Sequence, residues 1–380
     1  MSSPGRAVPP ETGPGGSPAG AAAQRLRIGT PRADWVVVGL DNGGTTDNAT
    51  VLDAHGRFLV PGMLERPSLV REGPEAALGA LRDALSGVLR STGVDRSRVR
   101  AVGLCSPGPA SATGVISRRG STNFAHPDWH GFDLRAAAEA ALGVPVVYTN
   151  DGNAAGLYAH RHFFGAQAAE RSSVAVVIGT GLGGAVVHRG QVVTGATGTA
   201  GELGHVAIPM AGLLEPDQPE PRCNCGKSGD AESVASLTAI EVNLLPYWLT
   251  RYPGHELAGE RSPADAARRV RALGEAGDPM ATAIFRQQAM AVGRLLTIVA
   301  DVLDPDAYFV GGGVVEAAPA FREWFLASVR EHTDLREEAA ETAAFSLVPD
   351  LDMAGARGAA VAALSAVPAA ASIDVGAGGG

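Results

Sequence analysis

The sequence predicts an α/β fold of two lobes with a ligand-binding cleft between them. Two observations support this fold class. A glycine-rich turn between two β-branched runs occurs at residues 38–52 and again, about 140 residues later, at residues 176–187. Predicted strands and helices alternate along most of the remaining chain, which is typical of layered α/β proteins. The cleft between two such lobes is a natural ligand site.

The first half of the chain is expected to begin with a β-hairpin and to continue with strands and helices in turn. Short β-branched runs predict the strands, and Leu78, Leu81, Leu85 and Leu89 form an apolar stripe with helical spacing. The predicted strands cover residues 35–41, 48–53, 57–61, 99–104 and 144–148, and the predicted helices cover residues 74–92 and 132–142.

The second half of the chain is expected to be richer in helices. One helix is predicted to follow Asp151, and a short apolar strand is predicted to end at Gly311, Gly312 and Gly313. The predicted helices cover residues 153–163, 233–251, 263–277, 278–303 and 358–367, and two further strands are predicted at residues 308–310 and 345–348.

The predicted domains are an N-terminal lobe at residues 35–152 and a C-terminal lobe at residues 153–368. The final helix is expected to pack back on the N-terminal lobe. Residues 1–34 are rich in Gly, Pro, Ala and Ser, and residues 369–380 are rich in glycine. This composition predicts a disordered leader and a disordered tail.

The two glycine-rich turns predict a site for phosphate groups. Glycines allow backbone N–H groups to approach a ligand closely and to adopt positive φ, which forms a concave nest for anionic oxygens. Two nests that face each other can hold the phosphates of one nucleotide. The nest residues are Gly43, Gly44 and Thr45 in the first turn and Gly179, Thr180, Gly181 and Gly183 in the second.

Two other nucleotide-binding motifs are excluded. Residues 179–184 match G-x-G-x-x-G, but a strand is predicted after them where a dinucleotide fingerprint requires a helix. Gly226, Lys227 and Ser228 are similar to the end of a P-loop. Pro221, however, occupies the position where that motif needs its first glycine.

The composition limits the classes of partner. The 380 residues are 45% hydrophobic and carry a net charge of −9 with no basic patch, so nucleic acid is not expected as a partner. No apolar run reaches about 18 residues, so no membrane span is expected. Three cysteines make a poor disulfide framework and indicate a reducing, cytoplasmic location.

Asp151 is the candidate catalytic base. It follows an apolar strand and precedes a helix, where the helix dipole favours an ionised carboxylate that can take a proton from a hydroxyl group. The alternative is a plain N-cap aspartate. Asn150 beside it and the two glycine turns favour catalysis. Asp41 is a candidate to hold Mg²⁺, through water because Mg²⁺ dehydrates reluctantly, and its alternative role is to stabilise its own turn.

A third group of polar residues indicates a metal site. His205, Cys223 and Cys225 are ligands suited to zinc, and their alternative interpretation is a surface loop with chance cysteines. Glu202 precedes this group, and Asp230 and Glu232 follow it. Cys105 lies in an apolar strand and is expected to be a small buried hydrophobe.

Taken in order, these motifs resemble the ROK family of sugar kinases, bacterial glucokinases in particular, within the actin-like ATPase superfamily. The resemblance runs from about residue 35 to about residue 367 and implies the two-lobe actin-like ATPase (ribonuclease H-like) fold. The matching motifs are the phosphate-1 turn at residues 41–45, Ser106-Pro107-Gly108-Pro109, Asn123, Asn150-Asp151, the phosphate-2 turn at residues 179–184, Glu202-x-Gly204-His205, Cys223-x-Cys225-Gly226-x-x-Gly229 and the adenosine loop at residues 311–313.

The resemblance implies an ATP- and Mg²⁺-dependent kinase in which Asp151 takes the proton from the 6-hydroxyl of a hexose. It also implies a homodimer or homotetramer, and a structural Zn²⁺ on His205, Cys223 and Cys225 that holds the sugar-binding loop. The residues that it implies for binding the sugar hydroxyls are Asn123, Asn150, Asp151, Glu202, His205 and Glu232.

The sequence departs from the family pattern at two positions. Asp230 occupies the place of a third cysteine, so both a His-Cys-Cys-Asp zinc site and a weakened or absent zinc are open. Thr46 replaces a common lysine, and altered nucleotide affinity is expected. Residues 42–48 and 121–126 are also similar to kanosamine kinases, which adds weight to an amino-hexose substrate.

The expected function is therefore an ATP-dependent hexose 6-kinase for glucose or a glucose-like sugar. The first alternative is a kinase for an amino-hexose of the kanosamine or N-acetylhexosamine type. A non-catalytic sugar-binding protein is the second, motivated by Thr46 and Asp230. A sugar-responsive regulator is disfavoured because only about 34 residues rich in Gly and Pro precede the first strand.

Overall fold

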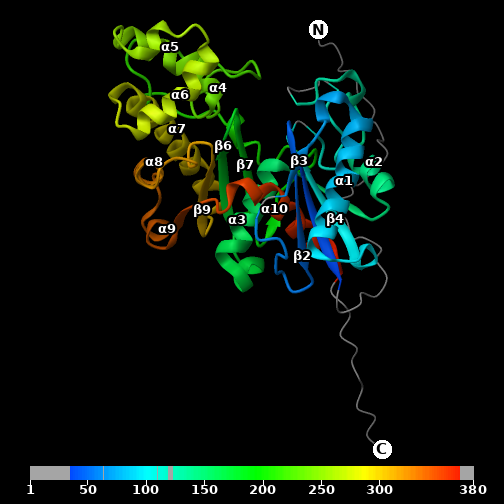
Figure 1. The fold of residues 1–380 in the computed structure, drawn as a ribbon. Coiled ribbons are helices and arrows are strands. Elements are labelled where there is room, and N and C mark those ends of the chain that lie inside the picture. Colours follow the sequence, from blue (N-terminus) through cyan, green and yellow to red (C-terminus); the bar gives the residue numbers. More distant parts are fainter. Residues whose placement is uncertain (1–34, 63, 109, 119–122, 369–380) are drawn as a thin grey trace, which may run out of the picture.

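The computed structural model describes residues 35–62, 64–108, 110–118 and 123–368, and it contains two five-stranded sheets. The predicted leader and tail lie outside the described residues. The sheets stand side by side with helices α3 (Asp151–Phe164) and α10 (Leu351–Ala366) between them (Figure 1). Within these described ranges, no helix is both long and apolar enough to cross a membrane.

The first sheet has the strand order β3-β2-β1-β4-β5. Strands β1 and β2 form an antiparallel hairpin, whereas β4 and β5 run parallel to β1. Helices α1 and α2 cover one face. The bounds are β1 Val36–Asn42, β2 Thr46–Asp53, β3 Glu65–Pro67, β4 Val99–Ser106, β5 Val146–Asn150, α1 Pro74–Thr92 and α2 Leu134–Leu142.

Alternation along β1 gives the first sheet two apolar faces. Val36, Val38 and Leu40 pack in the core under α1 and α2, whereas Val37 faces the opposite side and packs with Ala360 of α10. Successive side chains of a strand point to opposite faces, so a run of valines is buried on both. This double burial fixes β1 between two layers of helices.

The second sheet has the order β10-β9-β6-β7-β8, with β6 and β7 as an antiparallel hairpin and β9 parallel to both β6 and β10. The strand bounds are β6 Ser173–Ile178, β7 Leu182–His188, β8 Gln191–Val192, β9 Ala307–Gly312 and β10 Ala344–Leu347. The helices that follow β8 have the bounds α4 Leu237–Ala239, α5 Leu245–Arg251, α6 Pro263–Glu275, α7 Pro279–Leu303, α8 Pro319–Glu331 and α9 Glu337–Thr342.

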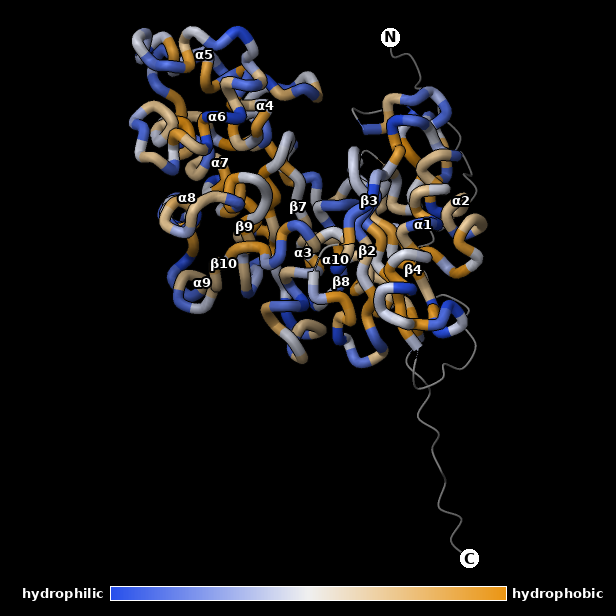
Figure 2. The backbone as a smooth tube through the Cα atoms, viewed as in Figure 1, coloured by the Kyte–Doolittle hydropathy of each residue, from blue (hydrophilic) through white to orange (hydrophobic). Residues whose placement is uncertain are grey.

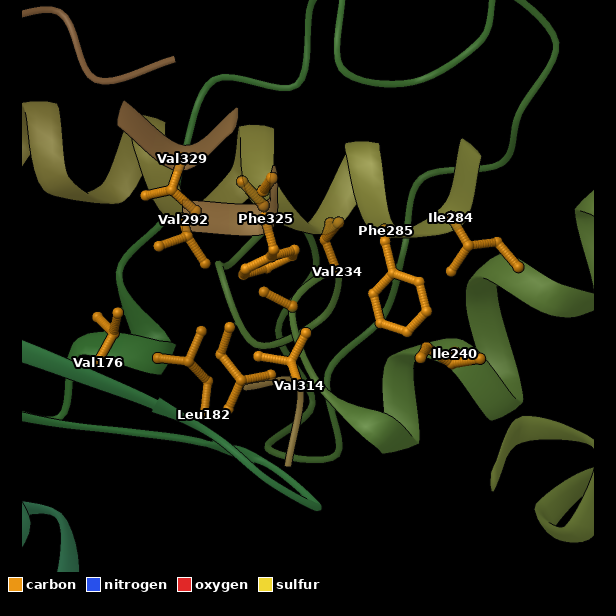
Figure 3. Packing of buried hydrophobic residues seen from close by; sticks show 14 of the residues in the cluster. Val176, Leu182, Val234, Ile240, Ile284, Phe285, Val292, Val314, Phe325 and Val329 are labelled. Atoms are coloured by element: carbon orange, nitrogen blue, oxygen red, sulfur yellow. The ribbon is translucent and has the colours of Figure 1, made fainter. Parts of the chain in front are cut away.

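The largest core lies between the second sheet and these helices. Figure 3 shows Val292 of α7 and Phe325 of α8 pointing toward Val176 and Leu182 of the sheet. The strands of both sheets are mostly hydrophobic, and polar segments lie at the periphery (Figure 2). Close packing of this kind makes the second lobe a rigid support for the turn between β6 and β7.

Glycines allow α3 and α10 to pack closely between the sheets. A Cβ atom on Gly358 would lie 1.8 Å from the carbonyl oxygen of Ala154 in α3. A Cβ atom on Gly39 of β1 would lie 1.9 Å from the carbonyl oxygen of Ala356. Because only glycine permits such approach, these positions set the distance between the two layers.

Most of the predicted elements are confirmed. The helix predicted at residues 74–92 is α1, and the α/β two-lobe fold class is also confirmed. The strand predicted at residues 57–61 is wrong, because only Phe58 forms an isolated bridge there and the third strand is Glu65–Pro67. The helix predicted at residues 233–251 begins only at Leu237 and contains a π-turn at Ile240–Leu244.

Candidate active site

Asp151 is the first residue of α3, immediately after the end of β5. The helix is capped by Asn150, whose Oδ1 accepts hydrogen bonds from the N–H groups of Gly152 at 2.9 Å and Asn153 at 3.3 Å. The N-cap role considered for Asp151 therefore belongs to Asn150. This leaves the Asp151 carboxylate, whose Oδ1 accepts the Gly152 N–H at 2.7 Å, exposed at the helix N-terminus.

The protonation of Asp151 is controlled by its surroundings. Protein around the carboxylate removes enough water to raise its pKa to about 6, although one side of the group remains open to solvent. The hydrogen bond from the Gly152 N–H lowers the pKa, and the negative charges of Asp41 and Glu202 raise it. At neutral pH Asp151 is ionised, and a base whose pKa lies near the working pH is effective in proton transfer.

Asp41 lies near the end of β1 and faces α10. Its Oδ1 accepts a hydrogen bond from the Cys105 thiol at 3.2 Å, and a Cβ atom on Gly355 would lie 2.3 Å from its Oδ2. Burial raises the pKa of Asp41 to about 6. Cys105 is buried as predicted, and burial followed by the charge of Asp41 raises its pKa well above the usual value.

The first glycine turn lies directly after Asp41. It closes through a hydrogen bond from the N–H of Gly43 to the carbonyl of Thr46 at 2.9 Å, and Thr45 is exposed. A Cβ atom on Gly44 would lie 2.3 Å from Oδ1 of Asn123, so Asn123 contacts this turn. The neighbouring residues 121–122 lie outside the described part of the chain.

The second glycine turn joins β6 to β7 and lies against the start of α3. The N–H of Gly179 donates to the carbonyl of Gly181 at 2.9 Å, and Thr180 is exposed. Gly183, in β7, is also exposed. A Cβ atom on Gly152 would lie 3.0 Å from the backbone of Gly184, which brings Asp151 next to this hairpin.

The expectation of positive φ in the two turns is wrong. No glycine of either turn adopts it, and close contact explains their presence instead. A side chain on Gly44 would displace Asn123, and one on Gly181 would lie 2.5 Å from the Glu232 carboxylate. Small size rather than unusual backbone conformation is therefore what these positions require.

A cavity of about 360 Å³ extends from the second turn between helices α6 and α7. Of the three glycines predicted for an adenosine loop, only Gly313 lines it. Gly311 packs against Val348, and Gly312 (φ 92) packs against the backbone of Ile178. The lining residues are Ile178, Gly179, Thr180, Leu237, Ile240, Ala267, Arg268, Arg271, Phe285, Gln288, Gly313 and Val314.

The His-Cys-Cys-Asp group forms a compact cluster. The potential ligand atoms of His205, Cys223, Cys225 and Asp230 all lie within 4.8 Å of one another. His205 Nδ1 lies 3.4 Å from Asp230 Oδ2 and 3.8 Å from Cys223 Sγ, and Cys225 Sγ lies 3.5 Å from Asp230 Oδ2. Tetrahedral zinc bonds of about 2.0–2.3 Å separate ligand atoms by roughly 3.3–3.8 Å, so the cluster fits a zinc ion.

The two glutamates of the predicted sugar site precede and follow this cluster in the sequence. Glu202 is exposed and close enough to Asp151 to act on its pKa. Glu232 is half-buried, with Oε2 accepting the Leu182 N–H at 2.8 Å and Oε1 accepting the Cys223 thiol at 3.3 Å. The structure thus brings the acidic, glycine-turn and cysteine groups of the prediction into one region.

Sequence reasoning missed several neighbours of this region. The thiol contact of Cys105 with Asp41 joins adjacent strands, and the buried hydrogen bond from Asn42 to Asp47 at 2.7 Å joins the two arms of a hairpin. The helical residues that line the cavity, such as Phe285, have the same apolar spacing as core residues. The facing Asn42 and Asp47 side chains were the one usable signal, because polar residues in a predicted strand are unusual.

Comparison with known proteins identifies a family model and relatives that this chain matches. Residues 37–366 match the family model described as ROK family. The glucokinase of Thermotoga maritima is 32% identical over 283 residues, 74% of this chain and 83% of that protein. The N-acetylmannosamine kinase of Shigella flexneri is 29% identical over 307 residues, 79% of this chain and 91% of that protein.

A solved structure gives the same fold. The ROK family glucokinase from Streptomyces griseus, in complex with glucose and AMPPNP, has a TM-score of 0.63 and 28% identity. The match covers 87% of this chain and 99% of that one.

Proposed function

This chain belongs to the ROK family, and on that premise we propose that it transfers the γ-phosphate of ATP to the 6-hydroxyl of glucose or a glucose-like hexose. It is a phosphotransferase with an alcohol group as acceptor. The single observation that carries the proposal is the position of Asp151. Its carboxylate lies open at a helix start that touches the second glycine hairpin, so a base and a phosphate-binding turn are adjacent.

Asp151 is the proposed general base. Its pKa of about 6 still lies below neutral pH, so Asp151 is mostly ionised there, and the raised value makes it a stronger base for the proton of the 6-hydroxyl. Phosphoryl transfer depends mostly on positioning and charge stabilisation, so orienting the hydroxyl is as important as removing its proton. Asn150 supports this role because its capping bonds fix the start of α3.

The sugar hydroxyls would be bound by residues around Asp151. His205 presents Nδ1 to the cysteine cluster, so Nε2 is the nitrogen left for a hydroxyl group. The other proposed sugar-binding residues are Asn123, Asn150, Glu202 and Glu232, two of which already contact the glycine turns.

The nucleotide would extend from the cavity between α6 and α7 to the two turns. The base would enter the cavity beside Gly313 and Phe285, and the phosphates would meet backbone N–H groups of residues 43–45 and 179–183. Mg²⁺ would be held near Asp41 through water, since Oδ1 of that carboxylate already accepts the Cys105 thiol. When bound, the ion supplies charge stabilisation for the transferred phosphoryl group.

A second candidate is a kinase for an amino-hexose. The N-acetylmannosamine kinase of Shigella flexneri matches nearly as well as the glucokinases, and exposed Glu202 can accept from an ammonium group as readily as from a hydroxyl. Release of ADP with glucose, mannose, glucosamine, N-acetylglucosamine, N-acetylmannosamine and kanosamine separates the two. No release with any sugar would favour the non-catalytic binder.

Replacement of the proposed base tests the mechanism. Asp151→Asn keeps the shape of the side chain but removes its basicity, so we expect sugar binding to be retained and kcat to fall by about 10²-fold or more. Calorimetry with the sugar and a coupled ADP assay measure the two effects. Turnover at the wild-type rate in this variant would rule out Asp151 as the base.

We also propose an oligomeric state and a cellular location for this chain. The resemblance favours a homodimer or homotetramer, which light scattering on the purified protein would measure. A cytoplasmic location is proposed from the low cysteine content and would be tested by cell fractionation.

A further inference from the structure

Glu232 connects the cysteine cluster to the second glycine turn. One carboxylate oxygen, Oε2, accepts the N–H of Leu182 at 2.8 Å, where the turn enters β7. The other, Oε1, accepts the thiol of Cys223 at 3.3 Å. A Cβ atom on Gly181 would lie 2.5 Å from Oε2, so the carboxylate lies directly against the turn. A residue that only bound sugar would not need these contacts.

The chain after Glu232 holds the same turn at two further points. The N–H of Leu237 donates to the carbonyl of Gly179 at 2.9 Å. Thr238 donates to the carbonyl of Thr180 from its N–H at 3.1 Å and from its hydroxyl at 2.8 Å. Leu237 also lines the 360 Å³ cavity, so one short segment reaches from the cluster to the proposed nucleotide site.

The other end of this segment is fixed at the cluster. Asp230 is 1% exposed, and its Oδ1 accepts the N–H of Ser233 at 2.9 Å while its Oδ2 faces the cluster. The N–H of Glu232 donates to the carbonyl of Gly204 at 2.8 Å, next to His205. The backbone of Glu232 is therefore held beside the cluster, and its carboxylate contacts both the cluster and the turn.

We propose that Glu232 is a positioning residue that orders the second glycine turn for nucleotide binding, and that it does so before any sugar is bound. This inference rests on the proposed kinase function and assigns Glu232 a role on the nucleotide side in addition to the sugar side. A zinc ion on the cluster would be held by Cys223 as a thiolate, which has no proton to donate. Oε1 of Glu232 would then be available to a sugar hydroxyl, while Oε2 would keep the Leu182 N–H.

Glu232 reaches the proposed sugar site through Oε1 and the second glycine turn through Oε2. A sugar hydroxyl on Oε1 restrains the carboxylate, and the restrained Oε2 then restrains the turn. Ligands that order the same element bind with positive coupling, because the second pays less ordering entropy than the first. Sugar should therefore tighten nucleotide binding, and this effect should depend on residue 232.

The experiment is a calorimetric titration of the full-length protein with MgADP in the absence of sugar. Glu232→Ala removes the acceptor of the Leu182 N–H, and we expect the Kd for MgADP to rise about tenfold, the scale of one charge-assisted hydrogen bond. Glu232→Gln keeps one oxygen for that N–H and should restore most of the affinity. Glu220→Ala removes an exposed glutamate near Gly229 and should leave the Kd unchanged.

Each outcome has a distinct meaning. Unchanged MgADP affinity in Glu232→Ala, with only the KM for sugar raised, would overturn the inference and leave Glu232 as a sugar ligand alone. Wild-type protein that fails to bind MgADP at all would overturn the kinase proposal as well. If Glu232→Ala does not fold, Thr238→Ala tests the far end of the segment: a several-fold weaker MgADP affinity supports the inference, and an unchanged one contradicts it.

Discussion

At the scale of single residues, three acidic groups in and beside the proposed site have raised pKa values. Asp41, Asp47 and Asp151 all have pKa values raised mainly by burial. The raised pKa makes Asp151 a stronger base. Asp47, in β2, has no such use, because its side chain is fully buried and its Oδ2 has no hydrogen-bond partner among the described residues.

Asp47 should make stability depend on pH. Its pKa in the folded state is about 7, above the ordinary value of 3.8, so the folded protein binds this proton more tightly than the unfolded chain. Ionisation therefore weakens folding as the pH rises between these two values, and the loss is complete above pH 7. Each pKa unit corresponds to about 1.4 kcal/mol.

Asp47→Asn removes this cost and keeps the shape of the side chain. We expect the variant to gain roughly 2–3 kcal/mol more stability, relative to wild type, at pH 8 than at pH 5. Urea unfolding at the two pH values measures the difference. Asp83→Asn, on the exposed face of α1, is the control and should change little at either pH. An equal gain at both pH values for Asp47→Asn would contradict the argument.

At the residue scale, the sequence indicates candidate site residues where a residue type carries its chemistry in its local context. Spacing indicates Asp151, the two glycine turns and the group of His205, Cys223 and Cys225, whereas Asp230 enters as a metal ligand only through the resemblance. The structure places the potential ligand atoms of all four cluster residues within 4.8 Å of one another and the start of α3 against the second turn. The contact of Cys105 with Asp41 could not be predicted, because it depends on the register of β1 against β4. The contact of Glu232 with Leu182 cannot be predicted either, because it depends on how the irregular segment around Glu232 packs against the start of β7.

At the scale of elements, α10 is the helix that both sheets share. It packs on β1 and β4 of the first sheet and against α3. Helix α3 in turn packs on β6 and β7 of the second sheet. Gly355 and Gly358 within it lowered its apparent helix propensity, so only its second half, from residue 358, was predicted. Tertiary packing outweighs that propensity, since these glycines are needed for close approach.

Gly358→Ala tests this packing. The added Cβ would lie 1.8 Å from the carbonyl oxygen of Ala154, a backbone atom that cannot move away cheaply. We expect a loss of about 1–3 kcal/mol in the free energy of unfolding, the usual cost of overpacking. Gly79→Ala in α1 is the matched control, because nothing lies within 4 Å of its Cβ position, and it should stabilise by roughly 0.5–1 kcal/mol. Denaturant unfolding of both variants measures whether the steric cost of the added Cβ atom exceeds the gain in helix propensity.

Elements with a strong period were predicted best. The leucine stripe of α1 gave its bounds correctly, whereas β3 has three exposed residues and no apolar pattern to find. The π-turn at Ile240–Leu244 was also hidden, because a single residue of helical slip leaves apolar spacing almost unchanged. Prediction failed where hydrogen bonding rather than hydrophobic burial decides the local structure.

At the scale of the whole molecule, the chain forms its site where distant segments meet. β5 and the start of α3 supply Asp151, the hairpin β6–β7 supplies the second turn, and residues 202–238 connect that turn to the cysteine cluster. The last of these segments has little regular structure, so its position depends on the cluster and on a few hydrogen bonds. This makes the cluster the point at which the order of the whole site is most easily lost.

Zinc at the cluster would hold this segment in place, and residue 230 provides the test. We expect about one zinc per chain by elemental analysis, and a lower melting temperature after chelation, since a metal that binds only the folded state stabilises it. Thiolates bind zinc more strongly than carboxylates, so Asp230→Cys should slow zinc release to a chromogenic chelator by tenfold or more. The variant loses the Ser233 hydrogen bond, which costs about 1 kcal/mol and sets the baseline for comparison in the metal-free protein. Wild-type protein purified without zinc, and unaffected by its addition, would show that the cluster is held by hydrogen bonds alone and that Asp230 has replaced a ligand without replacing its function.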